Sequence, residues 1–179
     1  MHTYIALLRG INVSGQKKIN MAELRAQLAE LDLHNIRTYI QSGNIVFGHT
    51  STDLPAMEQL IRDKIREKYG FDVPTLVKTP EDFAAALRNN PWKDNPEREE
   101  QRLYLTFLAE VPAPDLVAKL AQMDHSPEAW ALVGKDIYFF SPQGYGRAKM
   151  SNNYFEQKLK VAATTRNWNT VNKLLEMTL

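Results

Sequence analysis

The chain has 179 residues, of which 44% are hydrophobic and 24% charged, and its 22 basic and 21 acidic residues almost cancel. This length suits one domain or two small lobes that share a core, and the balanced charge leaves no global field to attract nucleic acid or an anionic membrane. Cysteine is absent, which excludes disulfides, thiolate catalysis and cysteine-ligated zinc.

The N-terminal region contains one short apolar run, residues 4–8, which Arg9 and Gly10 close. The run is too short for a secretory signal, and no basic residue precedes it. No stretch approaches the ~20 apolar residues that cross a bilayer. We therefore expect a cytoplasmic protein with no membrane segment.

The first half of the chain alternates between the periodicities of strands and helices. Its predicted order is strand, helix, strand, strand, helix, strand, at residues 4–8, 21–31, 35–41, 44–47, 53–69 and 73–78. Asn20 and Glu23 have the spacing of a capping box at the start of the first helix, and Gly70 is a typical stop for the second. Ser42 and Gly43 predict a tight turn between the two middle strands.

The second half repeats this order as a pattern, without matching residues. Thr79 and Pro80 begin a helix. A strand, a helix, two strands and a helix then follow, at residues 103–109, 114–123, 129–133, 137–140 and from 152 onward. Residues 90–100 contain two prolines and a charge run, which predicts a surface connector, with a functional lid as the alternative.

The repeated order predicts an α+β fold made of two ferredoxin-like lobes (β-α-β-β-α-β type) packed together. The lobes would comprise residues 1–79 and residues 80–179, the second with a terminal helix, and a single integrated domain is the alternative. We expect right-handed crossovers between parallel neighbouring strands, with one hairpin in each lobe.

Four segments carry a resemblance to a known family. They read LRGINV, KINMAEL, YIQSGNIVF and ATTRNWNTV, at residues 8–13, 18–24, 39–47 and 163–171. As a set they resemble the uncharacterised bacterial family called domain of unknown function 1697, and they stand in the expected order at both ends of the chain. The resemblance therefore spans nearly the whole chain and implies a two-lobed α+β fold, but no catalytic residue.

Polar residues in and beside these segments follow predicted strands, where binding groups usually collect. Arginine and lysine suit phosphate or carboxylate, and the N-terminus of a helix also favours anions. We therefore expect a site for a small anionic ligand. Its candidate residues are Arg9, Asn12, Lys17, Lys18, Gln41, Ser42, Asn44, Arg166 and Asn167. The competing interpretation is structural, with a hairpin turn at residues 41–44, asparagines as caps and Arg166 bonded to carbonyls.

Catalytic signatures are scarce. The four histidines, His2, His34, His49 and His125, are far apart and lack metal-ligand spacing. The nucleophile-elbow, Rossmann and Walker patterns are missing. The sequence leaves open whether the protein is an enzyme, and it implies neither a metal nor a cofactor.

A second class of function is binding of single-stranded RNA. Tyr104, Phe107, Tyr138 and Phe140 lie on strands that the predicted topology makes neighbours, and aromatic side chains on such a sheet can stack bases. Core packing of the same rings is the alternative, and the near-zero net charge argues against a large phosphate footprint.

A third class is a protein-interaction module without enzymatic activity. The last helix has an apolar stripe made of Trp168, Val171, Leu174, Leu175 and Met177. The stripe fits either the core of the chain or a dimer seam. The sequence therefore leaves the choice between monomer and homodimer open.

Overall fold

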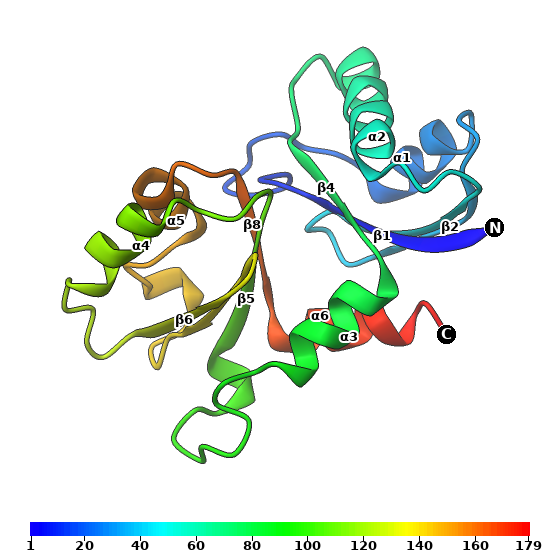
Figure 1. The fold of residues 1–179 in the computed structure, drawn as a ribbon. Coiled ribbons are helices and arrows are strands. Elements are labelled where there is room, and N and C mark those ends of the chain that lie inside the picture. The colour runs from blue at the N-terminus through cyan, green and yellow to red at the C-terminus, as the bar shows by residue number, and fades with distance from the viewer. The chain divides into compact units, whose positions relative to one another are not determined.

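The computed structural model describes residues 1–179, which form an α+β protein with six α-helices and two four-stranded sheets (Figure 1). The chain divides into two compact units. Unit 1 is Met1–Ala84 together with Leu174–Leu179, and unit 2 is Ala85–Lys173. Each unit contains one sheet.

Unit 1 follows the order strand, helix, strand, strand, helix, strand. These elements are β1 (His2–Leu8), α1 (Met21–Leu28), β2 (His34–Tyr39), β3 (Asn44–His49), α2 (Leu54–Tyr69) and β4 (Thr75–Lys78). The strands lie side by side in the order β2-β3-β1-β4, and every neighbouring pair is antiparallel. The prediction of parallel neighbours was therefore wrong, because β3 of the hairpin inserts between β1 and β2, the two strands that the α1 crossover connects.

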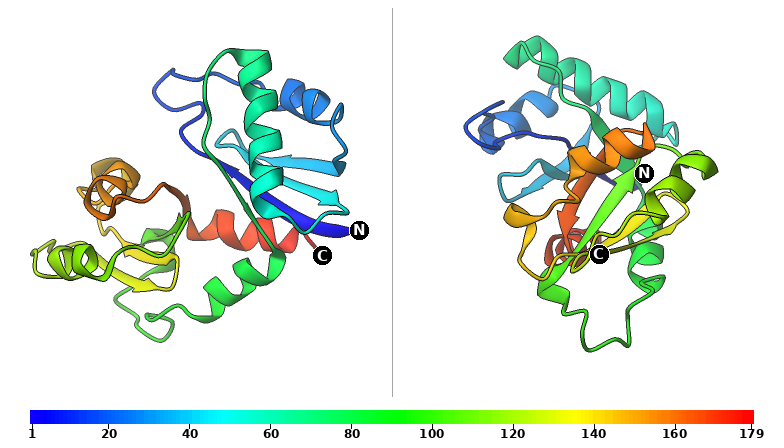
Figure 2. Two further views of the ribbon diagram at one scale, coloured as in Figure 1. Left: turned by 45° about the horizontal axis from the view of Figure 1, so that its top comes forward. Right: turned by 90° about the vertical axis from the view of Figure 1, so that its left-hand side faces the viewer.

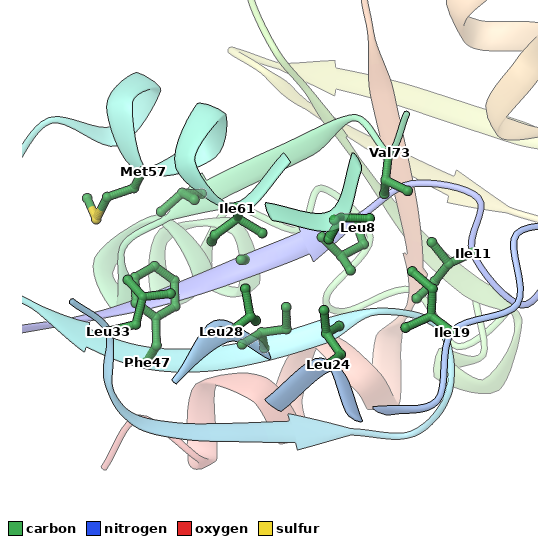
Figure 3. Packing of buried hydrophobic residues seen from close by; sticks show 14 of the residues in the cluster. Leu8, Ile11, Ile19, Leu24, Leu28, Leu33, Phe47, Met57, Ile61 and Val73 are labelled. Carbon is green, nitrogen blue, oxygen red and sulfur yellow. The ribbon is translucent and has the colours of Figure 1, made fainter. Parts of the chain in front are cut away.

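The core of unit 1 lies between its sheet and the two helices, α1 and α2 (Figure 2). Figure 3 shows the packing, to which Leu24 and Leu28 of α1 and Met57 and Ile61 of α2 contribute at the four-residue spacing of an amphipathic helix. On the opposite face of β1, Ile5 and Leu7 are also fully buried. Burial of both faces explains why the strand is a continuous apolar run.

The helix ends of unit 1 agree with the local sequence signals. The side chain of Asn20 accepts hydrogen bonds from the backbone of Ala22 and Glu23, so it is the N-cap of α1. Gly70 adopts a left-handed conformation directly after α2, which glycine does at little cost. None of the helices in the structure combines the length and the hydrophobicity needed to cross a membrane.

Unit 2 repeats the same order of elements after helix α3 (Pro80–Arg88) and a short 3-10 turn (Glu100–Arg102). Its elements are β5 (Leu103–Leu108), α4 (Pro114–Ala121), β6 (Ala129–Val133), β7 (Asp136–Phe140), α5 (Asn152–Leu159) and β8 (Ala163–Asn167), and helix α6 (Trp168–Glu176) follows. The sheet order is β6-β7-β5-β8, again with only antiparallel neighbours.

The structure corrects the prediction of a helix from residue 152 onward. Helix α5 ends where Lys160 adopts a left-handed conformation, with φ of 56°. Strand β8 then pairs with β5 before the last helix begins. Thr164 and Thr165 favour the strand, since β-branched side chains restrict the helical rotamers and pack well on a pleated surface.

Helices cover both faces of the unit 2 sheet. On one face, Phe139 of β7 packs with Phe155 of α5 and Leu120 of α4. On the other face, the Tyr138 hydroxyl donates a 2.6 Å hydrogen bond to the carbonyl of Ala86 in α3, and its ring lies 6.4 Å from that of Trp168 in α6. The sheet of unit 2 therefore presents no open face.

We predict that Gly43→Ala destabilises the fold, because Gly43 lies close against the side chains of Leu8 and Ile11. Gly43 has φ of 82°, and an added Cβ would lie 2.5 Å from Cβ of Leu8 and 3.0 Å from Cδ1 of Ile11. Left-handed strain and overpacking together should cost about 2–4 kcal/mol in the free energy of unfolding, measured by urea denaturation.

Gly15→Ala is the matched control for this substitution. Gly15 has a similar φ of 73°, but no atom lies within 4 Å of the added Cβ. It should cost only the strain, about 1–2 kcal/mol. Equal losses for the two variants would contradict the close contact of Gly43 with β1.

Candidate functional site

The loop that leaves β1, residues 9–18, is here called the β1–α1 loop. Five of its residues have positive φ angles, namely Gly10, Asn12, Ser14, Gly15 and Lys17. Three of these carry side chains, for which the left-handed region costs roughly 1–2 kcal/mol each. Such a conformation persists only where surrounding contacts hold it, and residues of this kind cluster at binding sites.

Asn12 supplies several of these contacts. Its Oδ1 accepts a hydrogen bond from the backbone N–H of Ile19 at 2.8 Å, and its Nδ2 donates to the carbonyl of Ile19 at 3.0 Å. The same Nδ2 donates to the carbonyl of Gln41 at 2.7 Å. A single amide therefore closes the β1–α1 loop and fastens it to the hairpin between β2 and β3.

The hairpin between β2 and β3 is itself held by a buried amide. Nδ2 of Asn44 donates to the carbonyl of Tyr39 at 3.1 Å and to the hydroxyl of Ser42 at 3.0 Å. At the turn, Ile40 has φ of 49° and is 48% exposed, which is unusual for a β-branched residue. Gln41 is also exposed. Asn44 and Ser42 thus fix a strained turn that directs Gln41 to solvent.

Lys17 fastens the other side of the loop. Its Nζ donates a 2.6 Å hydrogen bond to the carbonyl of Asp72. The carboxylate of Asp72 is in turn held by Nε of Arg62 and Nη2 of Arg66, each at 2.6 Å. Hydrogen bonds from Arg62 and then Arg66 hold the pKa of Asp72 well below its usual range. Two arginines therefore neutralise the carboxylate of Asp72, the residue whose backbone carbonyl binds Lys17.

The structure brings seven of the nine predicted site residues into two joined loops of unit 1. Four of them form internal contacts as described above, namely Asn12, Lys17, Ser42 and Asn44. Arg9 is half-buried at the end of β1, and its backbone N–H donates to the carbonyl of Pro74 at 3.0 Å. Lys18 and Gln41 are exposed. The outward-facing groups are therefore a cation and an amide on a fixed backbone.

Arg166 and Asn167, the other two predicted residues, belong to β8 in unit 2. Arg166 is 7% exposed, and its Nη1 donates to the hydroxyl of Thr164 at 2.8 Å and to the carbonyl of Thr165 at 2.9 Å. Burial lowers its pKa to about 10, so the guanidinium remains charged at neutral pH. Oδ1 of Asn167 accepts from the backbone N–H of Thr170 at 2.8 Å, which caps α6.

The aromatic residues considered for RNA stacking lie in the core of the protein. Phe107, Tyr138 and Phe140 are buried. Tyr104 is half-buried, and its ring lies 5.9 Å from that of Phe139 and 5.2 Å from that of Tyr145. Base stacking needs an accessible ring face, and these strands offer none. The RNA hypothesis therefore has no support from these four rings.

The stripe on the last helix is also largely buried. Trp168, Val171 and Leu174 have almost no exposed surface, whereas Leu175 and Met177 are half-buried. These side chains already pack within the chain. They therefore do not provide the exposed apolar seam that a dimer through this helix would require.

The cluster of Arg62, Arg66 and Asp72 was not predicted from the sequence. Arg62 and Arg66 stand four residues apart on α2, a spacing that places two cations on one helix face and could have indicated an acidic partner. Nothing local identifies Asp72 as that partner. No group of three or more His, Cys, Asp or Glu side chains in the structure is arranged to hold a metal ion.

We predict that Asp72 makes the stability of the protein depend on pH. Because its folded-state pKa is depressed, its stabilising contribution is complete above the unfolded value of about 3.9 and is lost as the pH falls below it. Asp72→Asn should therefore be less stable than the native sequence at pH 7, and the difference should shrink below about pH 4.

Urea denaturation across the range from pH 7 to pH 3, at low ionic strength, measures this difference. Asp94→Asn is the matched control, since Asp94 is exposed in the 90–100 connector. A profile for Asp72→Asn that runs parallel to that of the native sequence would contradict the assignment.

Comparison with known proteins agrees with the sequence resemblance. No curated protein matches the chain. Among solved structures, the chain is similar to "conserved bacterial protein SP0830 from Streptococcus pneumoniae", with 28% identity and a TM-score of 0.71, over 99% of this chain and 98% of that one. The family described as "Protein of unknown function (DUF1697)" matches residues 1–138, most of the chain. The protein is therefore a member of the DUF1697 family.

Proposed function

We propose that unit 1 binds a small anionic ligand, bearing phosphate or carboxylate, at the junction of the β1–α1 loop and the β2–β3 hairpin. The observation that carries the proposal is the bridge from Asn12 to Ile19 and Gln41, which fixes a strained loop while leaving Lys18 and Gln41 exposed. A site whose groups are already in position binds without a cost of ordering them.

The residues of the proposed site divide into two roles. Lys18 and Gln41 contact the ligand, Lys18 as a point charge and Gln41 through its amide, with Arg9 and Lys17 adding positive charge beside them. Asn12, Ser42 and Asn44 hold the two loops in place, as their internal hydrogen bonds indicate. Arg166 and Asn167 are also proposed as ligand-binding residues, and the affinity of variants at these positions tests this.

The proposal concerns recognition and assigns no reaction. The groups gathered at the junction are cations and amides, which stabilise negative charge through position and electrostatics. The two side chains proposed to contact the ligand, Lys18 and Gln41, include no histidine, serine or carboxylate, and the hydroxyl of Ser42 accepts a hydrogen bond from Asn44. Whether chemistry follows binding therefore depends on the ligand.

We infer further that each unit is a ferredoxin-like lobe. The support is the shared order of elements and the shared strand orders, β2-β3-β1-β4 and β6-β7-β5-β8. The same inference includes a boundary between the two lobes near residue 79. A cytoplasmic location is likewise proposed, because a chain without cysteine fits a reducing compartment.

A titration of the intact, isotope-labelled protein with inorganic phosphate, citrate and adenosine monophosphate tests the site. We expect backbone amide shifts to change first at residues 9–20 and 40–44. Lys18→Ala should weaken binding of the best probe by about tenfold to a hundredfold, since hydrogen bonds to charged groups contribute roughly 1.5–3 kcal/mol. Affinity should also fall with added salt, because exposed charges are screened.

Lys93→Ala is the matched control, because Lys93 is an exposed lysine of unit 2. It should leave the affinity unchanged. A folded Arg166→Gln variant with native affinity would remove Arg166 from the site. Saturable shifts that avoid both loops, or equal affinities for Lys18→Ala and Lys93→Ala, would refute the proposed site.

A further inference from the structure

Each of the two sheets has two edge strands, and the four edges differ in their protection. The edges are β2 and β4 in unit 1, and β6 and β8 in unit 2. An edge strand presents unpaired N–H and C=O groups that can template pairing with another chain. Proteins usually blunt such edges with charges, bulges, prolines or covering side chains.

Side chains cover the edge backbone of β4 and β8. In β4, the N–H of Val77 donates to Oε1 of Glu58 at 2.9 Å. In β8, the N–H of Ala163 donates to Oε2 of Glu156 at 3.0 Å, and its carbonyl accepts from Nδ2 of Asn152 at 2.9 Å. Both edges therefore have polar side chains where a foreign strand would have to bond.

The edge of β2 is blunted by irregularity and charge. Its register against β3 shifts between His34 and Arg37, and Asn35 within this bulge has φ of 52°. Arg37 is exposed, and the carbonyl of Tyr39 accepts a hydrogen bond from Asn44. A bulged, charged strand of this kind is a poor template.

Strand β6 has none of these protections. Its sequence, AWALV, contains no charge and no proline, and it pairs with β7 in unbroken register from Ala129 to Val133. The side chains of Trp130 and Leu132 pack against the core of unit 2, which fixes the strand. On its far side no strand follows.

The backbone groups that β6 leaves unpaired follow from its hairpin. A two-residue turn, Gly134 and Lys135, joins β6 to β7, so Val133 and Asp136 form the closing hydrogen-bonded pair. Because bonding alternates along an antiparallel pair, the N–H and C=O of Trp130 and Leu132 point away from β7. Two residues with outward donors and acceptors thus stand on one flat edge.

We propose that β6 pairs antiparallel with β6 of a second copy of this chain, about a two-fold axis through Ala131. In this register Trp130 faces Leu132 of the second copy, so the outward groups of both residues form reciprocal backbone hydrogen bonds. Ala129 faces Val133 of the second copy, which covers a side chain that is 40% exposed in the single chain. The two sheets become one continuous antiparallel sheet.

Charge favours a second copy over an unrelated peptide. The register places Glu128 opposite Gly134 of the second copy, so the exposed Lys135, one residue further along, lies diagonally across from that carboxylate. The carboxylate of Glu128 is held in place because it accepts hydrogen bonds from the backbone N–H groups of Lys149 and Met150, at 2.7 and 3.0 Å. Because of the two-fold axis, this contact occurs twice in the dimer. Strand β6 itself has no charged residue, so no charges repel each other along the pairing.

The expected dimer is weak. Stable interfaces bury about 1,200–2,000 Å² in total, whereas a single five-residue strand offers less. Dissociation should therefore occur in the range of about 10–100 μM, as for small transient contacts. Sedimentation velocity of the intact chain between 5 and 500 μM, at about fivefold steps, should show a rising average mass.

Charge-swapped variants test the register. Ala131→Lys and Ala131→Glu each place like charges on the two-fold axis, and an inward lysine is a natural way of protecting an edge strand. Each variant alone should sediment as a monomer at 500 μM, and an equimolar mixture should associate again. Ala26→Lys, at an exposed alanine of α1, should behave as the native chain does.

Amide hydrogen exchange of the native chain provides a readout that does not depend on any variant. Exchange at Trp130 and Leu132 should slow at least threefold between dilute and concentrated samples. A native chain that remains monomeric up to 500 μM would overturn the proposal. So would self-association that leaves these two amides unchanged, or that persists equally in both Ala131 variants.

Discussion

The structure of unit 1 depends on the burial of β1 on both faces. Over residues 4–8 the strand is shielded by helices on one side and by further packing on the other, so its side chains there are almost entirely apolar. The charged and amide side chains begin only after the strand ends, at Arg9 and Asn12. At that end Leu8 donates to the carbonyl of Gly43 and Arg9 donates to the carbonyl of Pro74. Three separate segments of the chain therefore meet where β1 stops, and this is where the candidate site lies.

The same residues that shape this end are those that sequence reasoning named as ligand-binding. The side chains of Asn12 and Asn44 donate hydrogen bonds to backbone carbonyls of the two loops. They take the place of the regular backbone partners that irregular loops lack, and that buried N–H and C=O groups need. The contact of Lys17 with Asp72 adds a third fastening. A structural role and a binding role are compatible here, because a loop has to be rigid before its exposed cation can select a ligand.

Local sequence patterns predicted the elements well where one residue or one period decides the outcome. Asn20 caps α1, Gly70 ends α2, and the apolar run of residues 4–8 is a strand buried on both faces. The patterns failed at β8, where a short strand between two helices has no room for a clear period. They also could not reveal the bond from Asn12 to Gln41, which joins residues 29 positions apart.

Unit 1 is discontinuous along the chain, since Leu174–Leu179 belong to it while all of Ala85–Lys173 forms unit 2. Leu174 is fully buried. Synthesis proceeds from the N-terminus, so residues 1–84 are made well before residues 174–179. Unit 1 is complete only when both segments are present. A fragment that stops at residue 84 lacks part of unit 1 and is therefore a poor choice for expression as a separate domain.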